Sequence, residues 1–328
     1  MKSRKLRIGM FLLLVASVSA TPLWARDLIL AEVQPPTHLL VKSEEVLASR
    51  LGQLTNGALI VQIKHSSQLG NEDSVWKAVR TGSLDLARVN IGTLVSEISA
   101  AKILSLPYLF RSREHLWSVL GGDFGQRLRF EIAKNDAILL GYYDSGSRSF
   151  YMTKKPIRFY SDFAGQNIRV QNSPIAKDLI TMLSGTPIVM SYDKVIDAFK
   201  DGSIDGAENN LTSYVATEHY KYARYLSLDE HTSAPEVLLM SKKAWESLTP
   251  EQKTAMNTAV KESSDYMRRL WTESEAQALA KARKEGVMVI EKSQIGMNGI
   301  EAFATKLYSK YTTDVEMLQT ILAILSVK

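Results

Sequence analysis

A single charged side chain, Arg169, stands between the β-branched residues Ile168 and Val170 in the segment SDFAGQNIRVQNSPIAK (161–177). Such neighbours predict a short strand, whose alternating side chains turn Arg169 to the face opposite theirs. A guanidinium offers a planar fork of donors that matches a carboxylate at two points. We therefore predict that Arg169 binds an anion. The alternative is a structural ion pair on the strand.

The residues after Arg169 predict a turn from this strand into a helix. Asn172 or Ser173 can cap the helix, and Pro174 suits its first turn. Gly185 can end it after an apolar stripe made of Ile175, Leu179, Met182 and Leu183. In open α/β sheets the carboxyl ends of strands border the ligand crevice, and helix N-termini there favour anions. Arg169 is thus expected beside a ligand crevice.

Catalytic motifs are weak in this chain. It has no G-x-S-x-G, no HExxH, no phosphate-binding glycine loop and no cysteine. Its histidines are scattered, without a second metal ligand at helical i, i+4 spacing. The neighbours in Glu218-His219 and in Asp229-Glu230-His231 do not face one another on a helix or strand. We expect a binding protein with no cofactor and no metal, rather than an enzyme.

The N-terminus (1–25) has four basic residues followed by an apolar run from Ile8 to Val18, which is short for a membrane span. Small residues follow the run, which predicts a secretory signal peptide cleaved after Ala25, with Ala20 as the other candidate site. An uncleaved membrane anchor is the alternative. We expect export to the periplasm.

Charge and composition narrow the class of partner. The formal net charge is +5, and residues 1–25 hold four basic and no acidic side chains, which leaves +1 (5 − 4) for the rest. This balance gives no sign of a nucleic-acid or membrane-surface partner. Without cysteine there is neither a disulfide framework nor a thiol for lipid attachment. We expect a soluble monomer that binds a small molecule.

An internal repeat relates residues 70–90 (GNEDSVWKAVRTGSLDLARVN) to residues 190–210 (MSYDKVIDAFKDGSIDGAENN). The two copies align without gaps and share identical residues at eight positions, from Asp73/Asp193 to Asn90/Asn210. Each copy predicts a helix with one apolar face, a capping glycine and then a strand. The period is too long for a solenoid, so the repeat predicts two similar α/β lobes.

Two apolar strand candidates, 137–143 (AILLGYY) and 235–240 (PEVLLM), are expected to join the lobes. Chains that cross between lobes twice can open and close like a hinge. Thr249-Pro-Glu-Gln252 is a capping box with proline at the first helical position. The helical pattern after it reaches the region of Gly286, so this helix can brace both lobes.

Motifs spread over the chain resemble those of one family of binding proteins. They are SSQLGNE (66–72), GSLDLARVN (82–90), LPYLFRSREH (106–115), GYYDSGSRSFY (141–151), GQNIRVQNSP (165–174) and DGAENN (205–210). From about Asp27 to near the C-terminus the chain resembles a DctP-type solute-binding protein of the tripartite ATP-independent periplasmic (TRAP) transporters. The resemblance implies two α/β lobes around a ligand cleft, two β-strand crossings and one long helix spanning both lobes. It also implies an organic acid as ligand and the membrane subunits of a TRAP permease as partners.

The expected organisation follows from these features. After the signal peptide (1–25), residues 26–145 and 234–272 are assigned to lobe I, and residues 146–233 and 273–328 to lobe II.

The resemblance also implies which residues bind the ligand. Arg169 is the carboxylate clamp, Arg148 the second arginine, and Asn209 the amide that contacts the acid end of the ligand. For Arg148 the alternative is a salt bridge in the hinge loop. Tyr192 stands where the family often has an aromatic residue that packs on the ligand.

We expect three further residues at the site, each with an alternative role. Glu72, at the start of a helix, either stabilises the helix dipole or accepts hydrogen bonds from ligand hydroxyls. Asn90 and Asn210 are repeat partners. Each of them can either hydrogen-bond ligand hydroxyls or satisfy backbone groups.

The chain departs from the family pattern in two places. It has Lys194-Val195-Ile196 where the family commonly has Glu-Val-Tyr, and Glu208-Asn209-Asn210 where the family commonly has Glu-Asn-Pro. The second change adds an amide near the cleft. Together with GYYDSGSRSFY it resembles the branch that binds sugar acids, especially the hexuronates glucuronate and galacturonate. The alternatives are a C4-dicarboxylate or other sugar acid as ligand, an ABC-type binding protein, or a secreted hydrolase or lyase.

Overall fold

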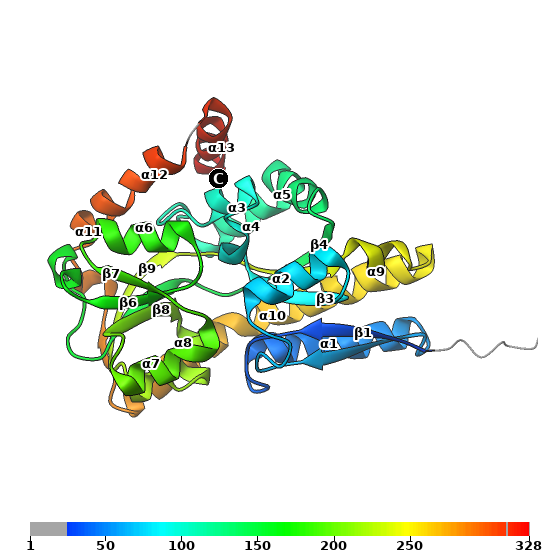
Figure 1. Cartoon of the computed structure of the whole chain (residues 1–328), viewed down its shortest axis with the longest axis horizontal. Helices are drawn as coiled ribbons and strands as arrows, with labels where there is room; N and C mark the ends of the chain where they lie inside the picture. Colours follow the sequence, from blue (N-terminus) through cyan, green and yellow to red (C-terminus); the bar gives the residue numbers. More distant parts are fainter. Residues whose placement is uncertain (1–24, 313, 328) are drawn as a thin grey trace, which may run out of the picture.

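The computed structural model describes residues 25–312 and 314–327, and the predicted signal peptide lies, apart from Ala25, outside these residues. The strands form two sheets, on the right and the left of Figure 1. The five-stranded sheet has the order β2 (Leu59–Lys64), β1 (Arg26–Ala31), β3 (Leu86–Asn90), β10 (Glu236–Ser241), β4 (Ala137–Tyr143). The six-stranded sheet has the order β11 (Met288–Ile290), β9 (Tyr225–Thr232), β5 (Arg148–Met152), β8 (Gly206–Asn210), β6 (Asn167–Val170), β7 (Thr186–Val189). The predicted two-lobed α/β fold is confirmed.

Each sheet has a parallel part and an antiparallel crossing strand. β1 is parallel to β2 and β3, and β6 is parallel to β7 and β8. β10 runs antiparallel to β3 and β4, whereas β5 runs antiparallel to β8 and β9. The chain passes from β4 directly into β5, and later from β9 directly into β10. These two passages are the strand crossings expected from the sequence, because β4 and β10 coincide with the two apolar strand candidates.

The internal repeat occupies equivalent places in the two sheets. α2 (Glu72–Thr81) leads into β3, and α7 (Val195–Asp201) leads into β8. Both helices end at a glycine in the left-handed region, Gly82 with φ 70° and Gly202 with φ 74°, a conformation that suits glycine because it has no Cβ. The strand that follows each helix pairs with the crossing strand of its own sheet.

A helix of 35 residues, α10 (Pro250–Lys284), runs along both sheets (Figure 1). Its predicted capping box is present, since Gln252 N donates to Thr249 Oγ1 (3.2 Å) and Thr249 N donates to Gln252 Oε1 (3.0 Å). Trp271 packs in the core around β1 and α1, while Ala282 packs in the core around β8. The helix therefore bridges the two lobes as expected. None of the described helices is long and apolar enough to span a membrane.

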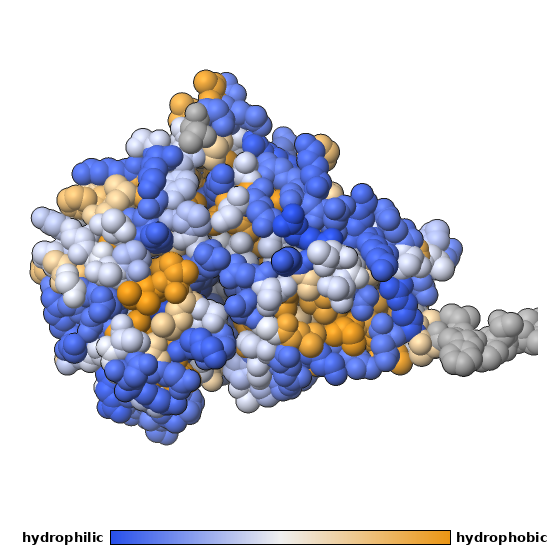
Figure 2. Space-filling view, viewed as in Figure 1, coloured by the Kyte–Doolittle hydropathy of each residue, from blue (hydrophilic) through white to orange (hydrophobic). Residues whose placement is uncertain are grey.

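Shorter helices cover the sheets. On the five-stranded sheet they are α1 (Leu39–Leu54), α2, α3 (Ser99–Leu104), α4 (Arg113–Gly121), α5 (Asp123–Ala133) and α9 (Lys242–Glu246). With the six-stranded sheet lie α6 (Pro174–Met182), α7, α8 (Leu211–Ala216), α11 (Met297–Ala304) and α12 (Lys306–Tyr311). Figure 2 shows hydrophobic areas on the side of α1 and β1 and on the side of β6 and β8, with hydrophilic residues between them.

Between them, the last two helices contact both lobes: Tyr308 of α12 donates to the Pro107 carbonyl (2.8 Å), in the segment assigned to lobe I. Tyr311, at the end of α12, donates through its hydroxyl to Asp178 of α6 (2.5 Å). In α13 (Val315–Ser326), the Ile324 carbonyl lies 2.8 Å from His115 Nε2 of α4, and Thr320 Oγ1 accepts from Arg127 of α5 (2.9 Å). Residues 273–328 were assigned to lobe II, but α13 packs against helices of the segment assigned to lobe I. The exact lobe boundaries remain a prediction.

Candidate functional site

A cavity lies where the carboxyl ends of β3, β6 and β8 meet. Its lining residues come from both sheets: Val33, Gln34, Glu72, Arg88, Asn90, Arg148, Arg169, Gln171, Tyr192, Asn209 and Glu236. This list contains every ligand-binding residue predicted from the sequence except Asn210. Residues predicted from distant parts of the sequence thus lie around one cavity, while their contact with a ligand remains a prediction.

Arg169 is held in the cavity without an acidic partner. Ile168 and Val170 are fully buried on the other face of β6, as the strand pattern predicted. Arg169 is only 3% exposed, and its Nε and Nη2 both donate to the carbonyl of Met190, at 3.0 and 2.8 Å. None of the ion pairs among the described residues includes it. Burial lowers the pKa of Arg169, and the Glu208 carboxylate opposes this effect. The structural ion pair weighed as the alternative is therefore absent from this part of the chain.

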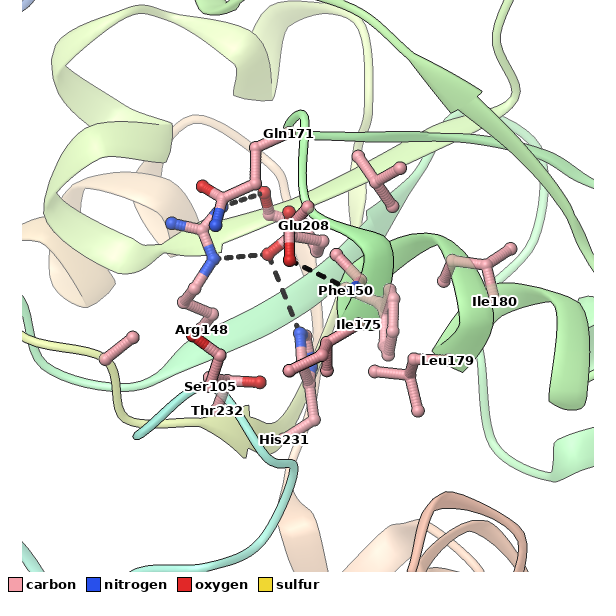
Figure 3. A pocket seen from close by; sticks show the side chains of 14 residues that line it. Ser105, Arg148, Phe150, Gln171, Ile175, Leu179, Ile180, Glu208, His231 and Thr232 are labelled. Carbon is pink, nitrogen blue, oxygen red and sulfur yellow. Dashed lines mark hydrogen bonds and ion pairs between the residues drawn. The ribbon is translucent and has the colours of Figure 1, made fainter. Parts of the chain in front are cut away.

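Arg148, in contrast, is neutralised. It is the first residue of β5, and its Nε forms a buried ion pair with Glu208 (Figure 3). Its Nη1 donates to Asn209 Oδ1 (2.8 Å) and its Nη2 to the carbonyl of Glu208 (2.9 Å). The salt bridge considered as the alternative role of Arg148 is present, but on the strand rather than in the hinge loop. The Arg148 side chain also lines the cavity.

His231 supports Glu208 from behind (Figure 3). Its Nδ1 lies 2.9 Å from Asp229 Oδ2, its Nε2 lies 3.6 Å from Glu208 Oε2, and its ring stacks on Phe150 with centroids 4.2 Å apart. Burial alone would lower the pKa of His231, but the carboxylates of Asp229 and Glu208 outweigh it and raise this pKa to about 9. Burial raises the pKa of Glu208, but Arg148 and His231 outweigh this effect and hold it at about 2.

The sequence-based view of Asp229-Glu230-His231 was incomplete. Successive side chains on β9 do alternate, yet Asp229 and His231 are two residues apart and therefore share a face. Their contact contributes a structural charge pair behind the cavity wall.

The opposite wall is built around Arg88, which sequence reasoning did not assign to the site. Arg88 is 1% exposed; its Nε donates to Glu32 (2.7 Å) and its Nη1 to both Glu72 and Glu236 (2.8 Å each). Burial would lower the pKa of Arg88, but these carboxylates hold it well above its ordinary value. Glu44 lies fully buried behind this group, and burial together with Glu32 raises its pKa well above the ordinary range.

Glu72 and Asn90 join the same network. Glu72 Oε1 accepts from the backbone N of Asn90 (3.1 Å), and Glu72 Oε2 accepts from Thr93 Oγ1 (3.1 Å). Asn90 donates through Nδ2 to Glu236 (3.0 Å) and accepts from the backbone N of Gly92 (2.9 Å). Glu72 also opens α2, so the helix-end position and the cavity position coincide.

Asn210 has a different place from its repeat partner. Its Oδ1 accepts from the backbone N of Ser213 (2.7 Å) and from Thr212 Oγ1 (2.9 Å), which caps α8. It does not line the cavity. Of the two roles considered for Asn210, satisfying the backbone is the one seen, because both repeat partners cap the helix that follows their strand.

Hydrogen bonds join the two lobes across the cavity. Gln171 donates to Asn90 (3.2 Å), Gln34 donates to Ser213 (3.3 Å), and Tyr192 donates to Gln34 (3.4 Å). At the edge, Asn172 donates to Asp73 (3.1 Å), and His38 Nε2 lies 3.2 Å from Ser213 Oγ. The lobes are therefore closed over the cavity.

Comparison with known proteins identifies relatives of the chain. The family model described as bacterial extracellular solute-binding protein, family 7 (DctP), matches residues 30–314. A solute-binding protein of Chromohalobacter salexigens is 32% identical over 259 residues, which are 79% of this chain and 77% of that protein.

Solved structures agree with this match. A TRAP periplasmic solute-binding protein from Xanthobacter autotrophicus with bound β-D-galacturonate has 38% identity and a TM-score of 0.88, over 92% of this chain and 100% of that chain. One from Roseobacter denitrificans with bound β-D-glucuronate has 30% identity and a TM-score of 0.89, over 92% of this chain and 100% of that chain.

Proposed function

This chain belongs to family 7 of the bacterial extracellular solute-binding proteins, the DctP components of TRAP transporters, and on that premise we propose that it captures a hexuronate. The ligand is glucuronate or galacturonate, bound in the periplasm and delivered to the membrane subunits of a TRAP permease. Two related structures with these acids bound support the ligand class.

The observation that carries the proposal is the state of Arg169. A buried guanidinium without a carboxylate partner has lost its hydration and has not been neutralised, which is costly unless an anion binds. Arg169 is 3% exposed, lines the cavity and is held in place by the carbonyl of Met190. A ligand carboxylate supplies the missing charge, and the guanidinium fork fixes its orientation.

Neighbouring groups complete the carboxylate site. The Arg148 guanidinium lines the same cavity, although Glu208 already pairs with it. Asn209 uses its Oδ1 to accept from Arg148 and from the backbone N of Asn210 (2.8 Å), so its amide NH₂ is available to donate to the ligand. Tyr192 lies with its ring centroid 5.9 Å from the Arg169 guanidinium carbon and offers an apolar face to a sugar ring.

The other end of the cavity suits hydroxyl groups. Glu72, Asn90 and Glu236 line it with carboxylate and amide oxygens, which accept hydrogen bonds from a sugar. A ligand with one carboxylate and several hydroxyls therefore meets donors at lobe II and acceptors at lobe I.

Calorimetric titration of the mature chain, beginning at Arg26, tests the proposal. Galacturonate and glucuronate are the ligands, and galactose, which lacks the carboxylate, is the matched control. We expect saturable 1:1 binding of at least one uronate and no detectable binding of galactose. Binding of galactose as tight as that of the uronates, or no binding of either uronate, would show that the proposal is wrong. Unchanged uronate recovered after incubation would separate binding from turnover.

A further inference from the structure

The two walls of the cavity carry opposite formal charge. On the lobe I wall Arg88 meets the three carboxylates of Glu32, Glu72 and Glu236, which gives 1 − 3 = −2. Glu44 lies fully buried behind them, where burial and the Glu32 carboxylate raise its pKa well above the ordinary value, and it is left out of this count.

On the lobe II wall the sign is reversed. Arg148 and Arg169 line this wall, and the one carboxylate near them, that of Glu208, pairs with Arg148, which gives 2 − 1 = +1. Behind Glu208, the charges of His231 and Asp229 cancel each other. The excess charge therefore differs in sign between the two ends of one small cavity.

The donors of the lobe I wall are already in use. Arg88 donates from Nε, Nη1 and Nη2 to glutamate oxygens. Asn90 Nδ2 donates to Glu236, and Gln34 Nε2 donates to Ser213. Among the described residues on this wall, each side-chain donor nitrogen thus has an acceptor within the protein. A second ligand carboxylate at this end would lose water and would lie beside the carboxylates of Glu72 and Glu236.

From this geometry we propose that Glu72 and Glu236 make the lobe I wall a charge filter, which accepts the hydroxyls of a sugar monocarboxylate and rejects a ligand with a second carboxylate. The inference rests on the proposed function, because Arg169 must hold the first carboxylate at the opposite end. Hydroxyls donate to glutamate oxygens, whereas a carboxylate placed there repels them. Selectivity against a competitor built from such repulsion is a difference of affinities, separate from the affinity for the uronate.

The filter has a simple consequence for ligand choice. A C4-dicarboxylate or an aldarate carries carboxylates at both ends, so one of them must face Glu72 and Glu236 in either orientation. Like charges placed together at an interface cost several kcal/mol. The filter thus decides against the dicarboxylate alternative that the sequence left open.

The test compares galacturonate with galactarate, the six-carbon acid that carries a carboxylate at both ends. Calorimetric titration of the mature chain is expected to show at least about a hundredfold preference for galacturonate. Glu236→Gln and Glu72→Gln remove one negative charge each and should narrow this preference about tenfold or more. Because the two ligands differ in shape as well, the change of the ratio between proteins is the measurement that isolates charge.

A control variant is available on the same lobe. Glu45→Gln removes a negative charge from the solvent-facing side of α1, where Glu45 pairs with Lys42 and is 51% exposed. It should leave the preference unchanged. Glu236 is buried, so circular dichroism must confirm that Glu236→Gln folds; Glu72, with a side chain 18% exposed, provides the second variant if it does not.

The outcomes separate this inference from the proposed function. Equal affinity of the parent for galacturonate and galactarate overturns the filter and leaves uronate binding intact. The filter is also overturned if both glutamine variants keep the parent's preference, including the case in which galactarate stays undetectable throughout. A parent that binds neither acid overturns the proposed function, and the filter with it.

Discussion

The two copies of the internal repeat place opposite charges at equivalent positions. Arg88 on β3 and Glu208 on β8 occupy the same position of the repeat. The crossing strands are inverted as well, since Glu236 pairs in register with Asn90, whereas Arg148 pairs with Asn210, the repeat partner of Asn90. An arginine with a glutamate from the crossing strand in lobe I thus corresponds to a glutamate with an arginine from the crossing strand in lobe II.

Because of this inversion, two lobes with nearly the same backbone present cavity walls of opposite charge. The backbone, the helix caps and the strand pairing repeat, but the surplus of charge does not. In lobe I, Arg88 pairs with three carboxylates, so negative charge is in excess. In lobe II, Arg169 lies outside the repeat and belongs to none of the ion pairs among the described residues, so positive charge is in excess. We expect arginines in the two walls to respond differently to substitution, Arg88 through stability and Arg169 through ligand affinity.

Replacing Arg88 should have the largest effect, and on stability. Arg88→Met leaves the buried carboxylates of Glu32 and Glu236 uncompensated, which typically costs about 3–5 kcal/mol of unfolding free energy. Urea unfolding measures the change. Arg50→Met, which breaks the exposed pair with Glu262, is the control and should cost less than about 1 kcal/mol. Equal effects of the two substitutions would contradict the structural role of Arg88.

Replacing Arg169 should act on affinity instead. Arg169→Ala is expected to leave the fold intact and to cost about 2–5 kcal/mol of uronate binding, with Arg169→Lys a partial rescue because an ammonium lacks the two-point fork. Calorimetric titration with circular dichroism gives both quantities, and Arg269→Ala on the exposed side of α10 is the control. A well-folded Arg169→Ala protein with parental affinity would make Arg148 the better candidate for the clamp.

The two lobes should also lose stability at opposite ends of the pH range. His231 in lobe II has a folded pKa of about 9, above the unfolded value near 6.5, because of Asp229 and Glu208. Its contribution is complete below pH 6.5 and is lost as the pH rises through 9. The melting temperature should therefore fall over this interval by about 2–4 °C for each kcal/mol lost. In the variant His231→Gln this part of the fall should disappear.

His38 in lobe I should show the reverse dependence. Burial lowers its folded pKa to about 4, so its contribution is present above pH 6.5 and is lost as the pH falls through 4. Melting curves of His38→Gln against the parent between pH 7 and pH 4 test this assignment. If the melting temperature falls equally in both proteins on acidification, the loss of stability comes from groups other than His38.

The smallest effect expected is that of Glu72→Gln on uronate affinity. If Glu72 accepts from sugar hydroxyls, the substitution exchanges an ionic acceptor for a neutral one and should weaken galacturonate by about 1–2 kcal/mol. Cyclohexanecarboxylate, which has a ring and a carboxylate but no hydroxyls, should lose less in the same titration. Equal losses for the two ligands would leave Glu72 as a helix-end residue.

Much of the lobe II site could be predicted because the residues that indicate it are neighbours in the sequence. Arg169 lies between β-branched residues just before a Ser-Pro helix start, and both the strand and the cap are as predicted. A related pattern surrounds Arg88, which lies between Ala87 and Val89 in a short apolar strand, so the alternation that pointed to Arg169 could have pointed to Arg88 as well. The sequence could not show the partners of Arg88, because Glu32 and Glu236 are 56 and 148 residues away from it.

The symmetry of the repeat does not extend to every residue around the cavity. Asn90 and Asn210 share the role of helix cap, yet only Asn90 lines the cavity, because the strands around them contribute different side chains. In the C-terminal segment, which is assigned to lobe II, α13 packs through its apolar side chains against helices of the segment assigned to lobe I. Its Met317, Ile321 and Ile324 are buried, and its polar contacts are with α4 and α5.

The contacts of α12 and α13 with the two lobes have a mechanical consequence. Tyr311 is tied to Asp178 in lobe II, and Val315 begins the helix that packs on lobe I. Four residue steps can span at most about 14 Å when fully extended. Because Tyr308 of α12 also donates to the Pro107 carbonyl (2.8 Å), opening of the cavity must break contacts of α12 or of α13, and the short connection limits how far Tyr311 and Val315 can separate.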